Sequence, residues 1–158
     1  MDATTVDSRP SPDAFPMRIA ITVRFRDLDA MGHVNNSVYL TYFEEARVAY
    51  YRALTAKELD PATFDFVIAE IACTYRSPAR LGETLEVGIR TGEVRSRSFV
   101  FEYVITERES GRLVATGRSV QVAYDYTAGR AKPLSDEIVA RMEAFEGRPL
   151  RKPNAFTA

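Results

Sequence analysis

The sequence predicts an α+β domain in which an antiparallel, five-stranded sheet wraps around one long central helix. Five segments alternate apolar and polar residues with a period of two, which is typical of half-buried strands. One segment between the first two of these carries apolar residues three and four positions apart over about five turns. The order is strand, long helix, four strands, short helix. One helix and one antiparallel sheet bury each other most simply as two layers, with the helix across the concave face.

The first strand is expected from Arg18, where residues 18–26 alternate. Its apolar face is expected to hold Ile19, Ile21, Val23 and Phe25. A polar loop follows and ends in Asn35 and Asn36, residue types that favour a helix start. The inward face of the long helix is marked by residues at helical spacing: Tyr39, Tyr42, Phe43, Ala46, Ala49, Tyr50, Ala53 and Leu54. The opposite face is expected to expose Glu44, Glu45, Arg47 and Arg52.

Four more strands and a short helix are expected after a connecting segment that contains Pro61. The pair Ser110-Gly111 marks a tight connection, so the last strands are expected to form antiparallel hairpins. The four expected buried faces are Val67, Ala69, Ile71, Cys73 and Tyr75; Leu85, Val87 and Ile89; Phe99, Phe101, Tyr103 and Ile105; and Val114, Thr116, Val120, Val122, Tyr124 and Tyr126. The closing helix is expected to turn inward Leu134, Ile138, Met142 and Phe145.

The composition predicts one folded domain with polar ends. Residues 1–16 are rich in Ser, Pro, Asp and Thr and are expected to form a disordered arm, the domain is expected at 17–147, and residues 148–158 are expected to form a polar tail. A length of 158 residues suits one domain.

Several classes of function are excluded by composition. A net charge of −1 gives no global basic field for nucleic acid. No apolar run approaches the roughly 20 residues of a membrane span, and the first residues lack the pattern of a signal peptide. One histidine, His33, and one cysteine, Cys73, are too few for a Cys/His zinc cluster. We therefore expect a cytoplasmic protein with no metal, no nucleic-acid partner and no membrane partner.

Two motifs connect the chain to a known family. Residues 25–36 read Phe-Arg-Asp-Leu-Asp-Ala-Met-Gly-His-Val-Asn-Asn, and residues 39–47 read Tyr-Leu-Thr-Tyr-Phe-Glu-Glu-Ala-Arg. With Tyr-Arg-Ser-Pro-Ala at 75–79, this pattern resembles the hotdog-fold acyl-CoA thioesterases of the 4-hydroxybenzoyl-CoA thioesterase-like family. The resemblance covers residues 18 to about 145. The Gly-His-Val-Asn-Asn segment is closer to the members that act on long-chain and broad acyl-CoA substrates.

The resemblance implies a hotdog fold and hydrolysis of an acyl-CoA thioester without metal or other cofactor. It also implies a homodimer or homotetramer in which two sheets join and the active site lies between subunits. The second acid of the motif, Asp29, is implied as the catalytic carboxylate, acting as base or nucleophile. By alignment, the amide that polarises the thioester carbonyl falls near Asn36.

Elementary chemistry agrees with these roles. The first N–H groups of a helix lack helical partners and carry about half a positive charge, so the backbone from Val34 through Asn35 to Asn36 can stabilise an oxyanion. Gly32 has no Cβ and lets substrate approach its backbone. Tyr39 and neighbouring aromatic residues of the helix can belong to the core or line an acyl tunnel, and the sequence does not separate these alternatives.

Other residues compete for these roles. His33 could pair with Asp29 as acid and base, although shaping the loop is the simpler role. Asp27 is expected to order the loop. Another hotdog branch uses a glutamate of the central helix, which makes Glu44 and Glu45 the rivals of Asp29. Cys73 is expected to be a small hydrophobe rather than a nucleophile.

A basic segment is the candidate for holding the phosphates of coenzyme A. Arg95 and Arg97 alternate with serines, including Ser98, at the start of a strand, and the resembled family uses the equivalent run at the nucleotide end of CoA. Three alternatives remain open: an acyl carrier protein thioesterase, an acyl-CoA hydratase or dehydratase that uses Asp29 and His33, and a non-catalytic module that binds acyl-CoA.

Overall fold

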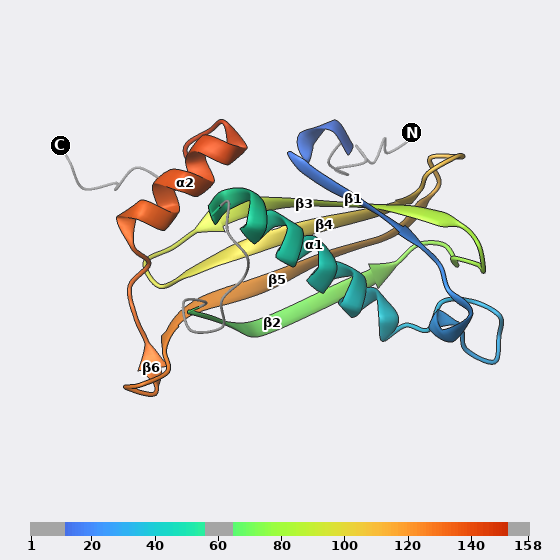
Figure 1. The fold of residues 1–158 in the computed structure, drawn as a ribbon, viewed down its shortest axis with the longest axis horizontal. Coiled ribbons are helices and arrows are strands. Elements are labelled where there is room, and N and C mark those ends of the chain that lie inside the picture. Colours follow the sequence, from blue (N-terminus) through green and yellow to red (C-terminus); the bar gives the residue numbers. More distant parts are fainter. Residues whose placement is uncertain (1–11, 56–64, 152–158) are drawn as a thin grey trace, which may run out of the picture.

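The long helix α1 (Val38–Thr55) lies across one face of an antiparallel sheet, as predicted (Figure 1). The computed structural model describes residues 12–55 and 65–151. The main strands are β1 (Met17–Thr22), β2 (Phe66–Tyr75), β3 (Thr84–Val94), β4 (Ser98–Glu107) and β5 (Leu113–Asp125), in the spatial order β1-β3-β4-β5-β2. A two-residue strand, β6 (Arg130–Ala131), pairs with β5. The predicted α+β, hotdog-type architecture is thereby confirmed.

The core lies between α1 and the middle of the sheet. The expected inward residues of β3 and β4 are buried on the helix side: Leu85, Val87, Ile89, Phe99, Phe101, Tyr103 and Ile105. The ring of Phe43 stacks on that of Tyr103 with centroids 4.2 Å apart. The same ring lies over Gly117 of β5, where an added Cβ would come within 2.5 Å of it. The helix therefore sits close to the sheet at a position where only glycine fits.

The expected buried face of β5 is wrong for most of the strand. The face that is buried consists of Ala115, Gly117, Ser119, Gln121 and Ala123, of which all but Gly117 are buried. On the other face, Val120, Val122 and Tyr124 are only half-buried and Tyr126 is exposed. The reason is steric. Small side chains are needed under the aromatic face of α1, so the β-branched residues occupy the other face.

The first strand is also shorter than expected. β1 ends at Thr22, and Phe25–Asp27 forms a 3₁₀ turn (η2) in which Phe25 is 80% exposed. Phe25 is therefore not a core residue. Arg24 binds the Asp27 carboxylate through its backbone N–H and its side chain, and these bonds turn the chain out of the strand.

Residues just outside both expected domain boundaries contact the fold. Residues 1–11 and 152–158 of the expected arm and tail, and Pro61, lie outside the described residues. Pro12–Ala14 forms a 3₁₀ turn (η1), and Phe15 is buried beside Gly88 with Arg90 above its ring. Leu150 is buried and its N–H binds the Glu143 carboxylate. These apolar contacts join residues 12–16 and 148–151 to the fold.

The closing helix α2 (Asp136–Glu146) begins after Ser135, whose side chain accepts the N–H of Ile138. Its last residue, Glu146, accepts hydrogen bonds from the Tyr50 hydroxyl and the Thr91 N–H at 2.8 and 2.6 Å. This attaches α2 to the far end of α1. Within the described ranges, no helix combines the length and apolar character needed to cross a membrane.

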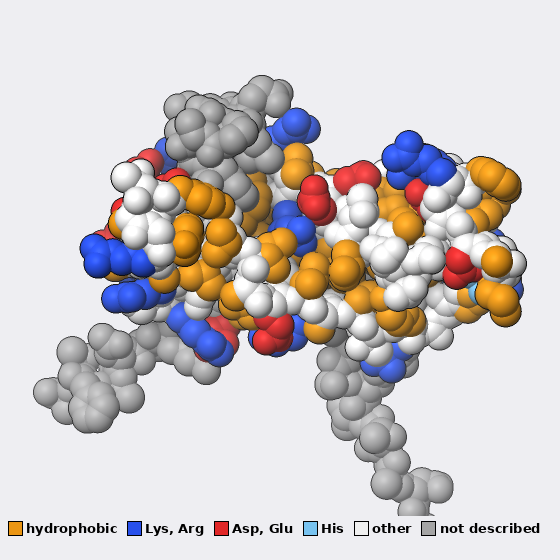
Figure 2. Space-filling view, turned by 90° about the horizontal axis from the view of Figure 1, so that it is seen from below, with side chains coloured by type: hydrophobic (Ala, Val, Ile, Leu, Met, Phe, Trp, Pro, Cys, Tyr) orange, Lys and Arg blue, Asp and Glu red, His pale blue; other side chains and the backbone are white. Residues whose placement is uncertain are grey.

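Strand β2 forms one edge of the sheet. Ten residues long, it pairs among the described strands with β5 alone, and a register shift interrupts the pairing between Ile68 and Glu70. Its side chains are at most half-buried, and Ile68 and Tyr75 are 46% and 48% exposed. Figure 2 views the molecule from this edge, where hydrophobic side chains gather at the surface. An unpaired, apolar edge of this length is a template for pairing with another chain.

Candidate active site

The acidic, glycine-containing motif folds as a tight hairpin that leads into α1. Its two arms are joined by Asn35 N–H to Asp27 O at 2.8 Å, by a bridge between Leu28 and Val34, and by Asp29 N–H to His33 O at 2.9 Å. At the tip, Gly32 donates to Asp29 O and has φ +76°, a left-handed conformation that glycine adopts without strain. The backbone conformation explains why glycine stands at this position.

Asp27 anchors the hairpin from inside. Its carboxylate is buried and accepts hydrogen bonds from the backbone N–H and side chain of Arg24, and from the Tyr42 hydroxyl at 2.9 Å. Burial alone would raise the pKa of this carboxyl, but these bonds together hold its pKa below its usual value. The loop-ordering role expected for Asp27 is the one that these contacts describe.

Asp29 presents a carboxylate that is only partly engaged. The side chain is half-buried, and Oδ1 accepts the N–H of Met31 at 2.8 Å. No hydrogen-bond partner for Oδ2 exists among the described residues. A fixed carboxylate with one uncommitted oxygen is suited to activate water or to attack a carbonyl carbon. His33 stands on the opposite arm, half-buried, and no hydrogen bond joins its ring to Asp29.

Among the backbone amides from Val34 to Ser37, one has no acceptor in the described part of the chain. Val34 N–H binds Ala79 O, Asn35 N–H binds Asp27 O, and Ser37 N–H binds the Asn35 side chain at 2.9 Å. Within the described chain, the N–H of Asn36 has no acceptor, and Asn36 is exposed. Of the amides expected from Val34 to Asn36, the structure therefore leaves Asn36 N–H free to bind an oxyanion.

The side chains of Val34 and Tyr39, two residues of the expected substrate site, lie in the core of this protomer. They are 5% and 3% exposed, and burial raises the pKa of Tyr39. The Asn35 side chain accepts from both the N–H and the hydroxyl of Ser37, so it acts as a helix cap.

The basic segment lies at the other end of the molecule from Asp29. The 18 residues of α1 span about 27 Å, and Tyr50, near its end, binds Thr91 of β3, just before the turn that carries Arg95 and Arg97. Both arginines are exposed and Ser98 is half-buried. One protomer thus does not bring them to the Asp29 hairpin (Figure 1).

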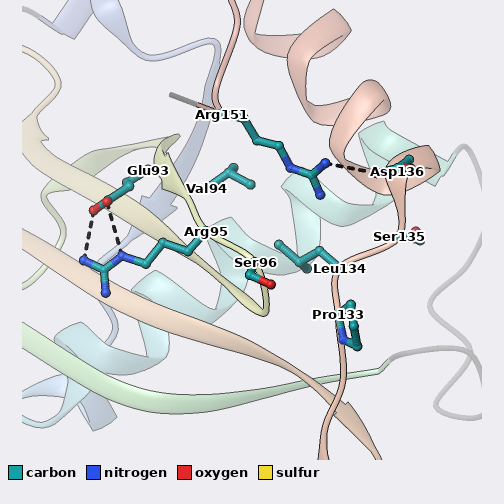
Figure 3. Close-up of a pocket in the computed structure, with 9 residues that line it drawn as sticks. All are labelled: Glu93, Val94, Arg95, Ser96, Pro133, Leu134, Ser135, Asp136 and Arg151. Atoms are coloured by element: carbon teal, nitrogen blue, oxygen red, sulfur yellow. Dashed lines mark hydrogen bonds and ion pairs between the residues drawn. The ribbon is translucent and has the colours of Figure 1, made fainter. Parts of the chain in front are cut away.

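A pocket of about 770 Å³ opens beside Arg95 (Figure 3). It lies between the β3–β4 turn and the start of α2, and its two arginines are already paired, Arg95 with Glu93 and Arg151 with Asp136. Arg97 is not among its lining residues. The charge of this pocket is therefore balanced within the chain.

The rivals of Asp29 are less well placed. Glu44 and Glu45 are exposed on α1, and among the described residues no hydrogen bond joins either of them to the hairpin. Burial raises the pKa of the Cys73 thiol, which disfavours the thiolate that a nucleophile requires. No cluster of three or more His, Cys, Asp or Glu side chains suited to a metal occurs among the described residues.

Arg47 is a feature that the sequence pattern assigned wrongly to solvent. It is 7% exposed, and its guanidinium donates to the Tyr103 hydroxyl at 3.2 Å, which in turn contacts Ser119 at 2.6 Å. The signal was present, because Arg47 lies four residues after Phe43 and four before Tyr51, on the same buried stripe.

The fold and hairpin together define a hotdog thioesterase, and comparison with known proteins agrees. The model of the Thioesterase-like superfamily matches residues 23–142, and the chain belongs to this family. The predicted class of enzyme, a thioester hydrolase, is confirmed by its homologues and structural neighbours.

Among the relatives, the long-chain acyl-CoA thioesterase FadM of Escherichia coli K12 is 30% identical over 133 residues, 80% of this chain and 97% of FadM. The acyl-CoA thioesterase YbgC of Haemophilus influenzae is 30% identical over 125 residues, covering 77% of this chain and 86% of YbgC. A crystal structure of a Thermus thermophilus thioesterase, complexed with coenzyme A and Zn, superposes with a TM-score of 0.79 at 39% identity, covering 87% of this chain and 99% of that one.

Proposed function

We propose that this protein hydrolyses acyl-CoA thioesters with Asp29 as general base or nucleophile and the N–H of Asn36 as oxyanion donor. The observation that carries the proposal is the hairpin itself. It carries the Asp29 carboxylate oxygen and leads directly into the Asn36 amide at the start of α1, and no described residue engages either group. An acyl-CoA substrate is supported by the names of FadM and YbgC and by the coenzyme A bound to the Thermus protein.

The chemistry follows from these two groups. As base, Asp29 takes a proton from water while the water oxygen bonds to the thioester carbonyl carbon, and the carbonyl electron pair moves to the oxygen. Asn36 N–H stabilises that negative charge, a contribution that typically amounts to roughly 10²–10³ in rate. When the C–S bond breaks, the leaving thiolate takes the proton from Asp29. As nucleophile, Asp29 would instead bond to the carbonyl carbon and expel the CoA thiolate, which leaves a mixed anhydride. Water then hydrolyses the anhydride to the free acid and the Asp29 carboxylate, and a proton of that water goes to the thiolate.

A second copy paired along β2 would complete this site. Antiparallel pairing across a two-fold axis places the Tyr75 end of one β2 beside the Phe66 end of the other. Phe66 of β2 pairs with Ala123 of β5, and Ser98 of β4 pairs with Val122 of β5. The β3–β4 turn, which carries Arg97, therefore lies at the Phe66 end of the sheet, two strands in from the β2 edge. Strands are about 4.8 Å apart. The partner subunit's Arg97 would therefore approach this protomer's hairpin.

This assembly gives the basic segment its function. Within one chain Arg95, Arg97 and Ser98 are an α1 length away from Asp29, but across the β2 edge they can hold the phosphates of a CoA whose thioester lies at the hairpin. A homodimer is the smallest assembly that satisfies this geometry, and a homotetramer would contain it. Because the proposed substrate is an acyl-CoA, we also propose that the protein acts in the cytoplasm.

The direct test is a panel of acyl-CoA esters from acetyl to palmitoyl, with benzoyl and 4-hydroxybenzoyl, followed by release of free thiol. We expect turnover, and we expect Asp29→Asn to lower kcat by at least about 10² with CoA binding retained. Glu44→Gln and Glu45→Gln are the matched controls, because they remove an exposed carboxylate from α1 and should leave kcat unchanged.

Several results would contradict the proposal. Full activity in Asp29→Asn would remove the carboxylate assignment. Turnover of acyl carrier protein thioesters alone would replace the substrate, hydration of crotonyl-CoA without thiol release would replace the reaction, and binding without any turnover would indicate a non-catalytic module.

A further inference from the structure

We propose that Tyr75, at the end of the edge strand β2, is a positioning residue for the oxyanion donor. Its hydroxyl donates a hydrogen bond to the carbonyl oxygen of Asn36 at 2.8 Å. Tyr75 would touch neither the thioester nor CoA. It would act through Asn36, whose N–H receives the negative charge, so this inference rests on the proposed function.

Both peptide groups that flank Asn36 are held by a hydrogen bond. On one side, the carbonyl of Asn35 accepts the N–H of Val38 at 2.9 Å. The carbonyl and N–H of a trans peptide point in opposite directions, so this bond directs the N–H of Asn36 out of the helix end. On the other side, the carbonyl of Asn36 is held by Tyr75. With both flanking planes fixed, the orientation of the Asn36 N–H is fixed too.

The hydroxyl of Tyr75 is itself well anchored. The ring packs edge-on against that of Tyr39, with centroids 5.2 Å apart, and Tyr39 is buried in the first turn of α1. The backbone of Tyr75 pairs with Ala115 of β5. Tyr75 therefore connects the sheet to the surface carbonyl of Asn36, which mobile water would otherwise bind.

The expected effect is on catalysis more than on folding. Tyr75 is 48% exposed, so the loss of its hydroxyl leaves a carbonyl that water can reach, and the fold should change little. An oxyanion donor works because it is already oriented when charge develops, without the cost of reorganisation. Without Tyr75, the peptide after Asn36 would be held through the Ser37 N–H and no longer at its carbonyl. The added motion of the donor would weaken binding of the transition state alone.

The test compares Tyr75→Phe with Tyr126→Phe. Tyr126 is a matched control, because it is 61% exposed and its hydroxyl also donates to a backbone carbonyl of β2, that of Phe66 at 3.4 Å. We expect Tyr75→Phe to lower kcat by roughly tenfold to a hundredfold with KM nearly unchanged. Its melting temperature should stay within a few degrees of the wild type, and Tyr126→Phe should match the wild type in all three quantities.

A second measurement is independent of turnover. The backbone order parameter of the Asn36 amide, measured by nuclear magnetic resonance, should be that of a rigid residue in the wild type and should fall in Tyr75→Phe. The inference is wrong if kcat survives the substitution, if KM changes instead of kcat, or if the Asn36 amide keeps its order. Absence of thiol release by the wild type would overturn the proposed function instead, and the order parameter would still decide whether Tyr75 orients Asn36.

Discussion

The hydroxyl of Tyr42 donates a hydrogen bond to the buried carboxylate of Asp27 at 2.9 Å and thereby fastens the hairpin that contains Asp29 to the central helix. Tyr42 is fully buried, and Asp27 also receives the backbone N–H of Arg24 at 2.9 Å. Two aspartates two positions apart thus have opposite surroundings. Asp27 is surrounded by donors inside the fold, whereas Asp29 has one carboxylate oxygen that no described residue binds.

Asp27 makes stability depend on pH in the acid range. Because its folded pKa lies below the unfolded value of about 3.9, the unfolded chain binds the proton more readily. The stabilisation is therefore complete above about pH 5 and is lost as pH falls through the folded pKa. We expect Asp27→Asn to cost about 1–3 kcal/mol at pH 7. Urea unfolding at several pH values should show this difference shrinking towards pH 3.

The control for this prediction is Asp29→Asn. The asparagine Oδ1 can still accept the N–H of Met31, so its stability should follow that of the wild type at each pH. A constant difference between wild type and Asp27→Asn down to pH 3 would show that the stabilising role of Asp27 does not depend on its charge.

Gly117 sets the distance between α1 and β5. A Cβ there would lie 2.5 Å from two ring carbons of Phe43 and 2.8 Å from the carbonyl oxygen of Ala72. We expect Gly117→Ala to lower the unfolding free energy by about 1–3 kcal/mol through overpacking. In Phe43→Leu, where the ring is gone, the same substitution should cost less, which a double-mutant cycle measures. Equal costs in both backgrounds would rule out the clash with Phe43.

The β2 edge should carry self-association. We expect Ile68→Lys, which places a charge on this edge, to shift the protein towards monomer in sedimentation velocity and to lower thioester turnover with it. Ala20→Lys makes the same addition at an exposed position on β1, the opposite edge, and should leave both unchanged. A monomeric wild type, or a dimer that survives Ile68→Lys, would contradict assembly through β2.

The two arginines of the basic segment should contribute unequally to CoA binding. Arg95 is bound by Glu93 at 3.1 Å, whereas Arg97 is exposed and forms no ion pair with a described acidic residue. We expect Arg97→Ala to raise KM for acyl-CoA more than Arg95→Ala, and more at low salt than at high salt. An unchanged KM for Arg97→Ala at low salt would remove this contact. The matched reference is Arg108→Ala, a substitution next to the β4–β5 turn.

The periodicity of apolar residues predicted the helices and strands well, because it reports which residues along the chain are buried. The helical spacing from Tyr39 to Leu54 predicted α1, and strict alternation predicted the buried faces of β3 and β4, whose large side chains all point to the helix. It failed where a small residue is the buried one. Gly117 and its small neighbours carry no hydrophobic signal. The valines of β5 were therefore predicted to form the buried face, although they lie on the other face.

The sequence by itself determined the order of the elements, the central helix and the acidic, glycine-containing hairpin before it, because these depend on local spacing and backbone preference. Only the tertiary structure decided which groups remain available for chemistry. Asp27 and Asp29 are the same residue type, but Tyr42 and Arg24 bind the carboxylate of Asp27, whereas one oxygen of Asp29 has no partner among the described residues. Likewise, the amide of Asn36, which binds no described residue, is held in place by neighbours that bind distant residues, Ala79 and Tyr75 among them. Contacts between residues far apart in the chain leave no periodic trace in the sequence.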